Sequence, residues 1–425
     1  MRDHRCTAIV VGIIVLLAAC STLFAQTAGQ QHIRSITVIT EVLGDGQKLT
    51  AVALEYDKEI DNSKLTPSIF SVEGRTITNV YAATAPVKST KRTNGKYVLI
   101  ELSPTDSAAA LFAQRGRSSA KVEAKAAVTQ TGSVTTIDGV KYGPSAGAML
   151  SDRVRNEVVD DFRQAEYKDP KTGAILRYNL FVPRQYDARR TYPLVLFMHD
   201  AGATSTEPTR TLVQGLGAVI WATPAEQAKH ACFVLAPQYS TQIVNDNSEA
   251  SEYLDTTIDL VELVASQFSI DKDRIYTTGQ SGGCMMSIAM GIKYPGFLAA
   301  MMLVAGQWDA EKSAVLAKDK LWIVVSEGDL KAFPGMNAIT ATLEREGAKV
   351  SRAVWDGQST PAQFAAAVSK MAADGSNVKY SVLKKGTVVP PGMADDGGSN
   401  HICTWRIAYT IEGVRDWLFG QQKSR

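Results

Sequence analysis

The stretch Arg274-Ile-Tyr-Thr-Thr-Gly-Gln-Ser-Gly-Gly283 decides the fold, because in it an apolar, β-type run enters a tight glycine-rich turn. A helical stretch follows over residues 284–293 and ends at Tyr294-Pro295. A strand that feeds a sharp turn and then a helix exposes the serine of a Gly-x-Ser-x-Gly motif at the carboxyl edge of a sheet. This order of elements predicts that Ser281 is a nucleophile.

Apolar runs alternate with helical stretches on both sides of this motif. Residues 193–199 form a continuous apolar run, which is typical of a strand buried on both faces. Other runs predict strands at residues 158–167, 175–182, 232–236, 274–278, 299–305, 321–325 and 378–383. The alternation predicts a mostly parallel sheet with helices on both faces, and together with the nucleophile turn it indicates the α/β-hydrolase fold.

The Gly-x-Ser-x-Gly pattern also occurs in Gly143-Pro-Ser145-Ala-Gly147. No strand comes before that match and no amphipathic helix follows it, so the pattern there predicts an ordinary turn. The surrounding elements, rather than the motif, distinguish Ser281 from Ser145.

A serine nucleophile needs a general base, and the chain has five histidines. In this fold the base follows the nucleophile in the chain. The histidines that precede the nucleophile are His4, His32, His199 and His230. His401 is therefore the predicted base, in a loop over residues 397–405 that leads into a final amphipathic helix.

The acid that orients this histidine should follow a strand between Ser281 and His401. Residues 321–325 form such a strand and Asp329 comes just after it, which makes Asp329 the predicted acid. Three other carboxylates stay open as alternatives, namely Asp309, Glu327 and Asp356.

Acyl transfer also needs backbone amides that stabilise an oxyanion. The amide of Gly282 is one predicted donor, because it follows the nucleophile directly. The second is expected from the loop after residues 193–199, where Ala201 is the predicted donor and Asp200 the alternative. His199 is expected to hold that loop.

Two residues beside the predicted turn are candidates for contact with substrate. Gln280 precedes the nucleophile, and Trp308 follows the next strand. For Trp308 a place in the core is the alternative. The pocket walls are expected from the loops 204–210, 240–252 and 389–399, whose folded positions the sequence does not define.

The region before the hydrolase pattern is of β type. Short alternating runs are separated by turn signals such as Asn94-Gly95, at residues 33–40, 49–56, 68–72, 77–82, 96–102 and 120–128. They predict an immunoglobulin-like β-sandwich over residues 32–140, without a catalytic cluster. A linker at residues 141–153 and a catalytic domain at 154–425 follow, and the β domain is a candidate surface for homo-oligomerisation.

The first residues are expected to be an export signal rather than part of the fold. Arg2 and Arg5 precede an apolar run over residues 8–19, which is too short to span a bilayer. This predicts a signal over residues 1–25. Leu17-Ala-Ala-Cys20 resembles a lipobox, so Cys20 is the predicted lipidation site of a periplasmic or cell-surface lipoprotein. Simple cleavage after Ala25, giving a secreted protein, is the alternative.

Composition limits the partners. Hydrophobic residues make up 45% and charged residues 21% of the 425-residue chain, which is ordinary for globular proteins. The net charge of +2 and the absence of a basic run argue against nucleic acid as a partner. Membrane contact is expected only through the lipid anchor, if Cys20 is modified.

Cys232, Cys284 and Cys403 follow the predicted signal. Their spacing fits no zinc site, so no metal is expected from them. Either three free thiols or a disulfide between Cys284 and Cys403 remains open.

The sequence resembles a group of bacterial carboxylesterases, also described as predicted peptidases, in which an immunoglobulin-like domain precedes the hydrolase domain. The resemblance rests on the stretch 271–283, Ala236-Pro-Gln, Asn400-His401, Thr404-Trp405 and the segment 409–419. It implies hydrolysis of carboxylic esters without a cofactor, with Ser281, Asp329 and His401 as triad. The group has His-Gly at the oxyanion loop, whereas this chain has His199-Asp200.

We therefore expect a serine carboxylesterase that acts through an acyl-enzyme on a small-molecule or polymeric ester, of short-chain or aryl type. A serine peptidase is one alternative, because the same triad cleaves amides. A surface polymer-binding protein with a lapsed hydrolase domain is the other.

Overall fold

The computed structural model describes residues 32–115 and 118–423 and divides them into two compact units. The first unit contains residues 32–40, 48–111 and 121–155, and the second contains 41–47, 112–115, 118–120 and 156–423. The expected export signal and its Cys20 lie outside the described residues. Within the described residues, no helix combines the length and the apolar character that crossing a membrane requires.

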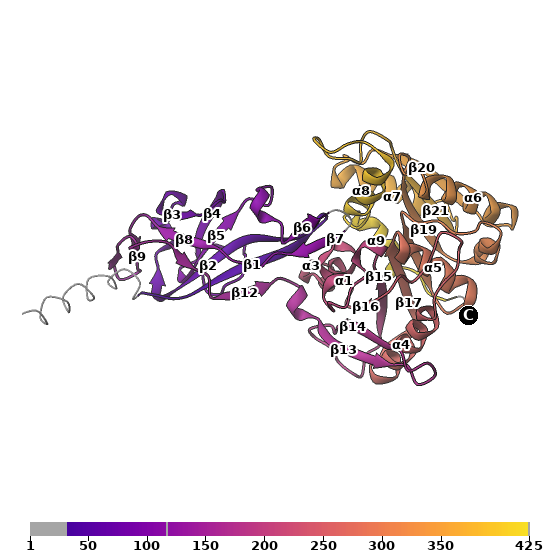
Figure 1. Cartoon of the computed structure of the whole chain (residues 1–425), viewed down its shortest axis with the longest axis horizontal. Helices are drawn as coiled ribbons and strands as arrows, with labels where there is room; N and C mark the ends of the chain where they lie inside the picture. Colours follow the sequence, from indigo (N-terminus) through magenta and orange to yellow (C-terminus); the bar gives the residue numbers. More distant parts are fainter. Residues whose placement is uncertain (1–31, 116–117, 424–425) are drawn as a thin grey trace, which may run out of the picture. The chain divides into compact units, whose positions relative to one another are not determined.

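The first unit is built from β-strands (Figure 1). Its larger sheet has the strand order β12-β1-β2-β5-β4, formed by β1 (Ile33–Leu43), β2 (Gly46–Ile60), β4 (Ile77–Ala83), β5 (Gly95–Leu102) and β12 (Arg153–Asn156). The smaller sheet has the order β11-β8-β3, formed by β3 (Phe70–Val72), β8 (Ala127–Gln130) and β11 (Met149–Leu150). A two-stranded ribbon pairs β9 (Val134–Thr135) with β10 (Lys141–Tyr142), and three 3-10 turns are η1 (Asn62–Lys64), η2 (Pro67–Ile69) and η3 (Ser107–Ala109).

Both sheets of this unit share one core. Val52 and Ile100 from the larger sheet lie in the same hydrophobic cluster as Val72 and Val128 from the smaller one. Side chains from two facing sheets that interdigitate in this way form a β-sandwich.

One predicted strand of this region is wrong. Residues 120–128 were expected to be continuous, but β7 (Ser118–Lys121) ends and β8 begins only at Ala127. The alternation of apolar and polar residues there is misleading, because Val122 is 42% exposed. The apolar side chains of this segment therefore do not form a buried face that would stabilise a strand. β7 pairs with β6 (Phe112–Arg115) instead.

The second unit contains a nine-stranded sheet with the order β13-β14-β16-β15-β17-β18-β19-β21-β20. Its strands are β13 (Arg163–Lys168), β14 (Ile175–Phe181), β15 (Tyr192–Met198), β16 (Phe233–Gln238), β17 (Ile270–Gln280), β18 (Ala300–Val304), β19 (Leu321–Ser326), β20 (Val350–Trp355) and β21 (Val378–Leu383). β14 pairs antiparallel with both of its neighbours, β13 and β16. From β16 onward in this order, every neighbouring pair of strands is parallel. This is the mostly parallel sheet that the sequence predicts.

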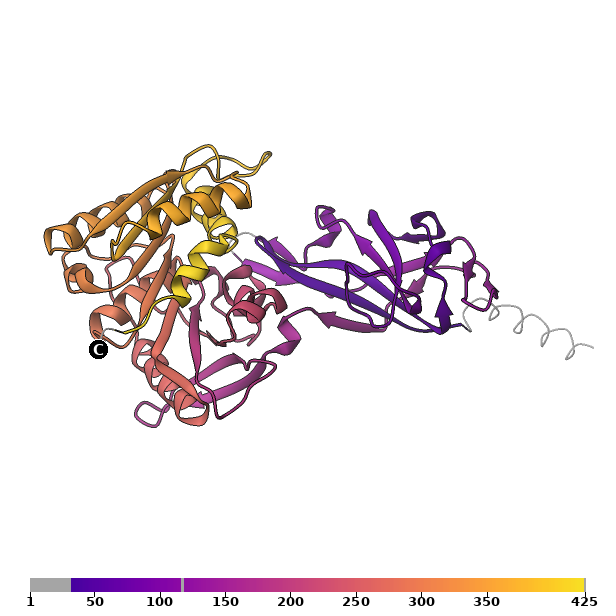
Figure 2. The same ribbon diagram turned by 180° about the vertical axis from the view of Figure 1, so that it is seen from behind.

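Helices cover both faces of this sheet (Figures 1 and 2). They are α1 (Arg210–Val213), α2 (Leu216–Val219), α3 (Pro224–Lys229), α4 (Tyr253–Gln267), α5 (Gly282–Lys293), α6 (Ala332–Arg345), α7 (Pro361–Ala372), α8 (Gly397–Ala408) and α9 (Glu412–Phe419). The 3-10 turns are η4 (Val159–Asp161), η5 (Ala201–Ala203), η6 (Ile220–Ala222) and η7 (Lys312–Lys318).

Alternation along β15 explains the two layers. Leu194 and Leu196 pack into the core that contains α4, α5 and α6, whereas Val195 and Phe197 pack into the core that contains α7, α8 and α9. Successive side chains of a strand point to opposite faces, so an unbroken apolar run supplies both cores.

Two predictions for this sheet need correction. The strand expected to begin at residue 158 begins at Arg163, because Val158 has a φ of 67° and residues 159–161 form η4. Strand β20 was not predicted, because it lies at the sheet edge and only Trp355 of its residues is buried.

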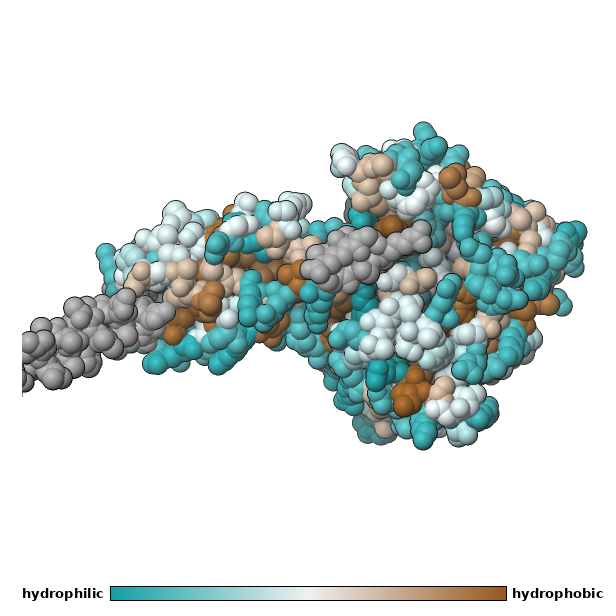
Figure 3. Space-filling view, in the orientation of Figure 1, coloured by the Kyte–Doolittle hydropathy of each residue, from teal (hydrophilic) through white to brown (hydrophobic). Residues whose placement is uncertain are grey.

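The face of the protein seen in Figure 3 is mostly hydrophilic, with hydrophobic residues in small separate groups. Scattered surface hydrophobics are normal for a soluble domain and need no functional explanation.

Candidate active site

Ser281 is the single residue between β17, which ends at Gln280, and α5, which begins at Gly282. Its φ of 51° and ψ of −116° lie in a region that L-residues rarely adopt. The Ser281 amide donates a hydrogen bond to the carbonyl oxygen of Val304 on β18 at 3.0 Å, which helps to hold this conformation. A strained backbone of this kind persists only where its surroundings enforce it, and it presents the hydroxyl above the sheet.

The two glycines of the motif allow this turn to pack against β15. A Cβ on Gly283 would lie 1.9 Å from the carbonyl oxygen of Met198, and one on Gly279 would lie 2.4 Å from the carbonyl carbon of Gly283. Real Cβ atoms do not approach so closely, so only glycine fits at both positions.

The structure brings the three predicted triad residues together. His401 Nε2 lies 2.9 Å from Ser281 Oγ, and His401 Nδ1 lies 2.5 Å from Asp329 Oδ2. The indole of Trp405 meets the His401 ring edge-on at 5.2 Å. Serine, imidazole and carboxylate thus form one hydrogen-bonded chain, which is the arrangement of a nucleophile, its base and the orienting acid.

Asp329 is held as a carboxylate. The residue is 2% exposed, and Oδ1 accepts hydrogen bonds from the amides of Lys331 at 3.0 Å and Ala332 at 2.9 Å. Burial raises the pKa of Asp329, but the hydrogen bond and charge of His401 and the two amides lower it more, so the net pKa is below its usual value. The group therefore stays ionised at neutral pH.

The segment that carries His401 is a helix, so the loop expected over residues 397–405 is wrong. Asp396 caps α8 by accepting a hydrogen bond from the amide of Ser399 at 2.7 Å. Asn400, fully buried, accepts a hydrogen bond from the Ser326 hydroxyl at 2.8 Å. This contact ties α8 to the end of β19, just before Asp329, and so places acid and base side by side.

The predicted oxyanion donors lie next to each other at the pocket. Both Gly282 and Ala201 begin helical turns, so their amides have no acceptor within those turns. A Cβ on Gly282 would lie 3.5 Å from the Ala201 nitrogen. The neighbouring Gly202 amide donates instead to Asp200 Oδ1 at 2.7 Å, which leaves Ala201 as the better-placed second donor.

The carboxylate of Asp200, where the resembling group has glycine, is part of the loop's own hydrogen bonding. Besides the Gly202 amide, it accepts a hydrogen bond through Oδ2 from Gln280 Nε2 at 3.0 Å. The loop is therefore fastened to the end of β17 by a charged hydrogen bond.

His199 supports the same loop from below. Its Nε2 accepts a hydrogen bond from the Tyr239 amide at 3.0 Å, so the proton is on Nδ1, which donates to the Asp200 carbonyl oxygen at 2.7 Å. Burial lowers the pKa of His199, which keeps the ring neutral. These contacts are those expected of a loop-holding residue.

Gln280 and Trp308 do not line the pocket, so the structure places neither where a substrate contact was expected. Gln280 is 1% exposed, because its side chain turns inward to Asp200 and Gln214. Trp308 is 8% exposed and packs in the core with α5, which is the alternative left open for it.

A cavity of about 650 Å³ opens above Ser281. Residues from the expected loops line it, including Thr204, the stretch 242–246 and the stretch 396–398. The sequence missed Met285 on α5 and Leu330 beside the acid, because a residue's distance to a cavity depends on long-range packing. Leu330 lines the cavity and is 77% exposed, so it lies at the rim.

The rejected alternatives have other partners. Asp309 Oδ1 accepts from the Lys312 amide, Glu327 Oε2 from the Lys385 amide, and Asp356 Oδ1 from the Gln358 amide. In the first unit, Ser145 Oγ donates to the Gly147 carbonyl oxygen at 2.8 Å within a turn.

The disulfide left open between Cys284 and Cys403 is not formed. Both are free and buried, as is Cys232. Cys284 packs in the core on one face of the sheet and Cys403 in the core on the other face, so the sheet separates the two thiols.

Residues 176–375 match the family model described as esterase PHB depolymerase, and residues 35–143 match the model of the esterase Ig-like N-terminal domain. The chain is an esterase built from these two domains. This esterase is similar to a solved thermostable esterase, with 28% identity and a TM-score of 0.79. The match covers 92% of the present chain and 100% of the solved one.

Other solved structures are more distant from this esterase. A mutant feruloyl esterase module from Clostridium thermocellum, complexed with sinapinate, has 13% identity and a TM-score of 0.39 over 60% of this chain and 88% of the other. A ferulic acid esterase from Anaeromyces mucronatus has 12% identity and a TM-score of 0.38, over 60% of this chain and 91% of the other. No protein with a curated description matches the esterase.

Proposed function

We propose that the esterase hydrolyses carboxylic esters through an acyl-enzyme on Ser281. His401 Nε2 takes the proton of Ser281 Oγ as the oxygen bonds to the ester carbon, and the carbonyl oxygen becomes an oxyanion that the Gly282 and Ala201 amides stabilise. Collapse breaks the bond to the alcohol oxygen, which receives the proton from His401. Water, deprotonated by the same imidazole, then attacks the acyl group and releases the acid.

One observation carries this proposal. The hydrogen-bonded chain from Asp329 through His401 to Ser281 ends at a hydroxyl that lines the 650 Å³ cavity. His401 has a side chain 25% exposed on the same cavity, whereas Asp329 is almost fully buried behind it. Base and nucleophile therefore face substrate, and the acid is protected from water.

We further propose short-chain or aryl esters as the substrates. The cavity volume falls in the range of about 300–1,000 Å³ that suits small molecules. Ile243, Val244 and Met285 give it an apolar side next to Ser281, which fits an acyl chain or an aromatic ring. The PHB depolymerase description of the matching family adds a polyester as a competing substrate.

Replacing Ser281 with Ala tests the mechanism. Loss of the nucleophile should lower kcat for p-nitrophenyl acetate on the order of 10⁴–10⁶-fold and abolish labelling by a fluorophosphonate probe. Ser145→Ala is the matched control, because it removes the serine of the same motif outside the site, and it should leave both unchanged. Parental activity in the Ser281→Ala variant would contradict the mechanism.

A substrate series tests the specificity. The kcat/KM values for p-nitrophenyl esters of increasing chain length and for methyl ferulate should be highest for short or aryl acyl groups. A clear preference for long chains, or for a PHB suspension over every soluble ester, would refute the proposed substrate class while leaving the triad intact.

We also propose export with lipidation at Cys20, on the basis of the lipobox-like stretch before it. Metabolic labelling with a radioactive fatty acid should mark the wild-type protein and fail to mark Cys20→Ser. Equal labelling of the two would refute it.

A further inference from the structure

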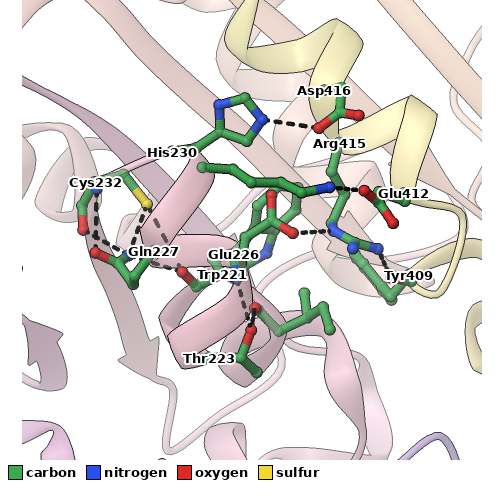
Figure 4. Close-up of polar contacts among 12 residues, drawn as sticks. Trp221, Thr223, Glu226, Gln227, His230, Cys232, Tyr409, Glu412, Arg415 and Asp416 are labelled. Atoms are coloured by element: carbon green, nitrogen blue, oxygen red, sulfur yellow. Dashed lines mark hydrogen bonds and ion pairs between the residues drawn. The ribbon is translucent and has the colours of Figure 1, made fainter.

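Three side chains of the types that bind metal ions meet where α3 and α9 lie side by side (Figure 4). Glu226 is on α3, His230 follows that helix directly, and Asp416 is on α9. One ligand atom from each lies within 4.8 Å of the other two. The His230 amide donates a hydrogen bond to the Glu226 carbonyl oxygen at 2.7 Å, so the end of the helix holds the two residues one turn apart. None of the three lines the cavity above Ser281.

Glu226 carries an oxygen without a partner. The side chain of this residue is 3% exposed, and its Oε2 accepts a hydrogen bond from Arg415 Nε at 2.8 Å. Its Oε1 is buried and has no hydrogen-bond partner within residues 32–115 and 118–423. Figure 4 shows that this oxygen points away from Arg415, toward the side of the cluster where His230 and Asp416 lie. A buried acceptor without a partner is destabilising, so a cation bound at this point would be stabilised.

His230 is oriented toward the same place. Its Nε2 lies 2.8 Å from Asp416 Oδ1, and its ring stacks on Phe419 at 4.4 Å with an interplanar angle of 13°. The stacking fixes the ring plane. The Asp416 side chain is 45% exposed, which leaves a path for an ion from solvent and freedom for the carboxylate to turn.

The local charges favour a cation. Glu226 is paired with Arg415, and Glu412 is paired with Lys229. Among the residues that the structure describes, the Asp416 carboxylate is ion-paired with His230 alone, so one negative charge is left when the ring is neutral.

We propose that Glu226, His230 and Asp416 bind one zinc ion. Imidazole and carboxylate ligands together suit Zn²⁺, and three protein ligands with a water complete its tetrahedral coordination. Zinc takes the position of the Nε2 proton, and that proton moves to Nδ1. Metal–ligand bonds of about 2.0–2.2 Å place tetrahedral ligand atoms about 3.4 Å apart. The three ligand atoms already lie within 4.8 Å of one another, and the exposed Asp416 side chain has room to turn toward an ion. The Arg415 hydrogen bond would orient the Glu226 carboxylate from behind.

Such an ion would hold the C-terminal helix α9 against α3. It would act as a structural site apart from ester hydrolysis, because neither helix supplies a residue to the triad. Binding to the folded protein should then raise its thermal stability.

Calorimetric titration of the tag-free, chelator-treated esterase with zinc chloride tests the proposal. We expect one equivalent of zinc to bind and the bound ion to raise Tm. With Co²⁺ as a probe in place of zinc, we expect visible absorption from nitrogen-coordinated metal. His230→Gln and Asp416→Asn should weaken zinc binding by more than the roughly 10–100-fold that loss of an outer-shell partner costs. Circular dichroism of the metal-free variants checks that both are folded.

Glu412→Gln is the matched control, because it removes a carboxylate on the same helix that is paired with Lys229 and is not a ligand. Its zinc affinity should stay within about tenfold of the wild-type value, because the loss of a residue that does not bind the metal directly costs at least roughly that much only when it supports a ligand. A wild-type protein that binds no zinc, or a folded His230→Gln variant that binds zinc as tightly as the wild type, would overturn the proposal.

Discussion

Replacing Asp329 with Asn keeps the size of the side chain but changes the atom that faces His401. In the wild type, Oδ1 accepts from the amides of Lys331 and Ala332, while Oδ2 faces His401 Nδ1. Only an oxygen can accept from both amides, so the new amide nitrogen must take the position of Oδ2. It donates a hydrogen bond there, so Nδ1 must accept and the imidazole proton moves to Nε2. His401 then presents an N–H to Ser281 and cannot take its proton.

The magnitude follows from this loss of the base. A triad histidine locked in the wrong tautomer lowers kcat on the order of 10⁴-fold, which is roughly 5.5 kcal/mol of transition-state stabilisation. Binding should change little, because Asp329 is 2% exposed behind His401, so KM should stay close to the wild type. The net pKa of Asp329 is lowered, so its carboxylate stabilises the fold above its unfolded pKa of about 3.9 and loses that contribution as pH falls through the lower folded pKa. At neutral pH the variant should therefore have a somewhat lower Tm.

Steady-state hydrolysis of p-nitrophenyl butyrate measures both constants. Asp309→Asn and Asp356→Asn make the same chemical change at the two aspartates among the alternative carboxylates, and both should keep the parental kcat. An Asp329→Asn variant with kcat within tenfold of the wild type would refute the reasoning. So would an equal loss in Asp309→Asn, because it would show that the assay reports stability rather than the triad.

Three other changes follow from the geometry around the nucleophile. Gly283→Ala puts a Cβ 1.9 Å from a carbonyl oxygen of β15, so it should destabilise the fold by about 1–3 kcal/mol or more in urea unfolding, whereas Gly147→Ala, with nothing within 4 Å, should be neutral. Gln280→Met removes the hydrogen bond to Asp200 and should lower kcat roughly tenfold through the oxyanion loop, and an unchanged kcat would show that the loop is held otherwise. Burial lowers the pKa of His199 in the folded protein. Between that pKa and the unfolded value of about 6.5, the unfolded chain therefore binds more protons than the folded one. The free energy of unfolding then falls as pH falls, by up to about 1.4 kcal/mol per pH unit. Urea unfolding at about pH 7.5 and about pH 5.5 should show a shallower dependence for His199→Gln, and an equal dependence would contradict this.

Local patterns were sufficient to predict the strand, turn and helix around Ser281 and most of the other strands. The strand before Ser281, the glycines around it and the helix after it are adjacent in the chain, so their steric requirements can be recognised there. The continuous apolar runs of β15 and β19 were equally clear, because a strand buried on both faces has no polar alternation. Local signals failed at β20, whose edge position left most of its side chains unburied, and at α8, whose glycine-rich start had indicated a loop.

The sequence by itself determined that Ser281 sits on a strand–turn–helix, that a β-sandwich precedes a parallel sheet, and that one histidine follows the nucleophile. Only the tertiary structure decided which carboxylate meets His401, that Gln280 turns toward Asp200 rather than substrate, and that Glu226, His230 and Asp416 meet. The physical reason is distance along the chain. Hydrogen bonding within a turn depends on neighbours, whereas these contacts join segments far apart in the sequence, and only packing of the sheet and helices brings them together.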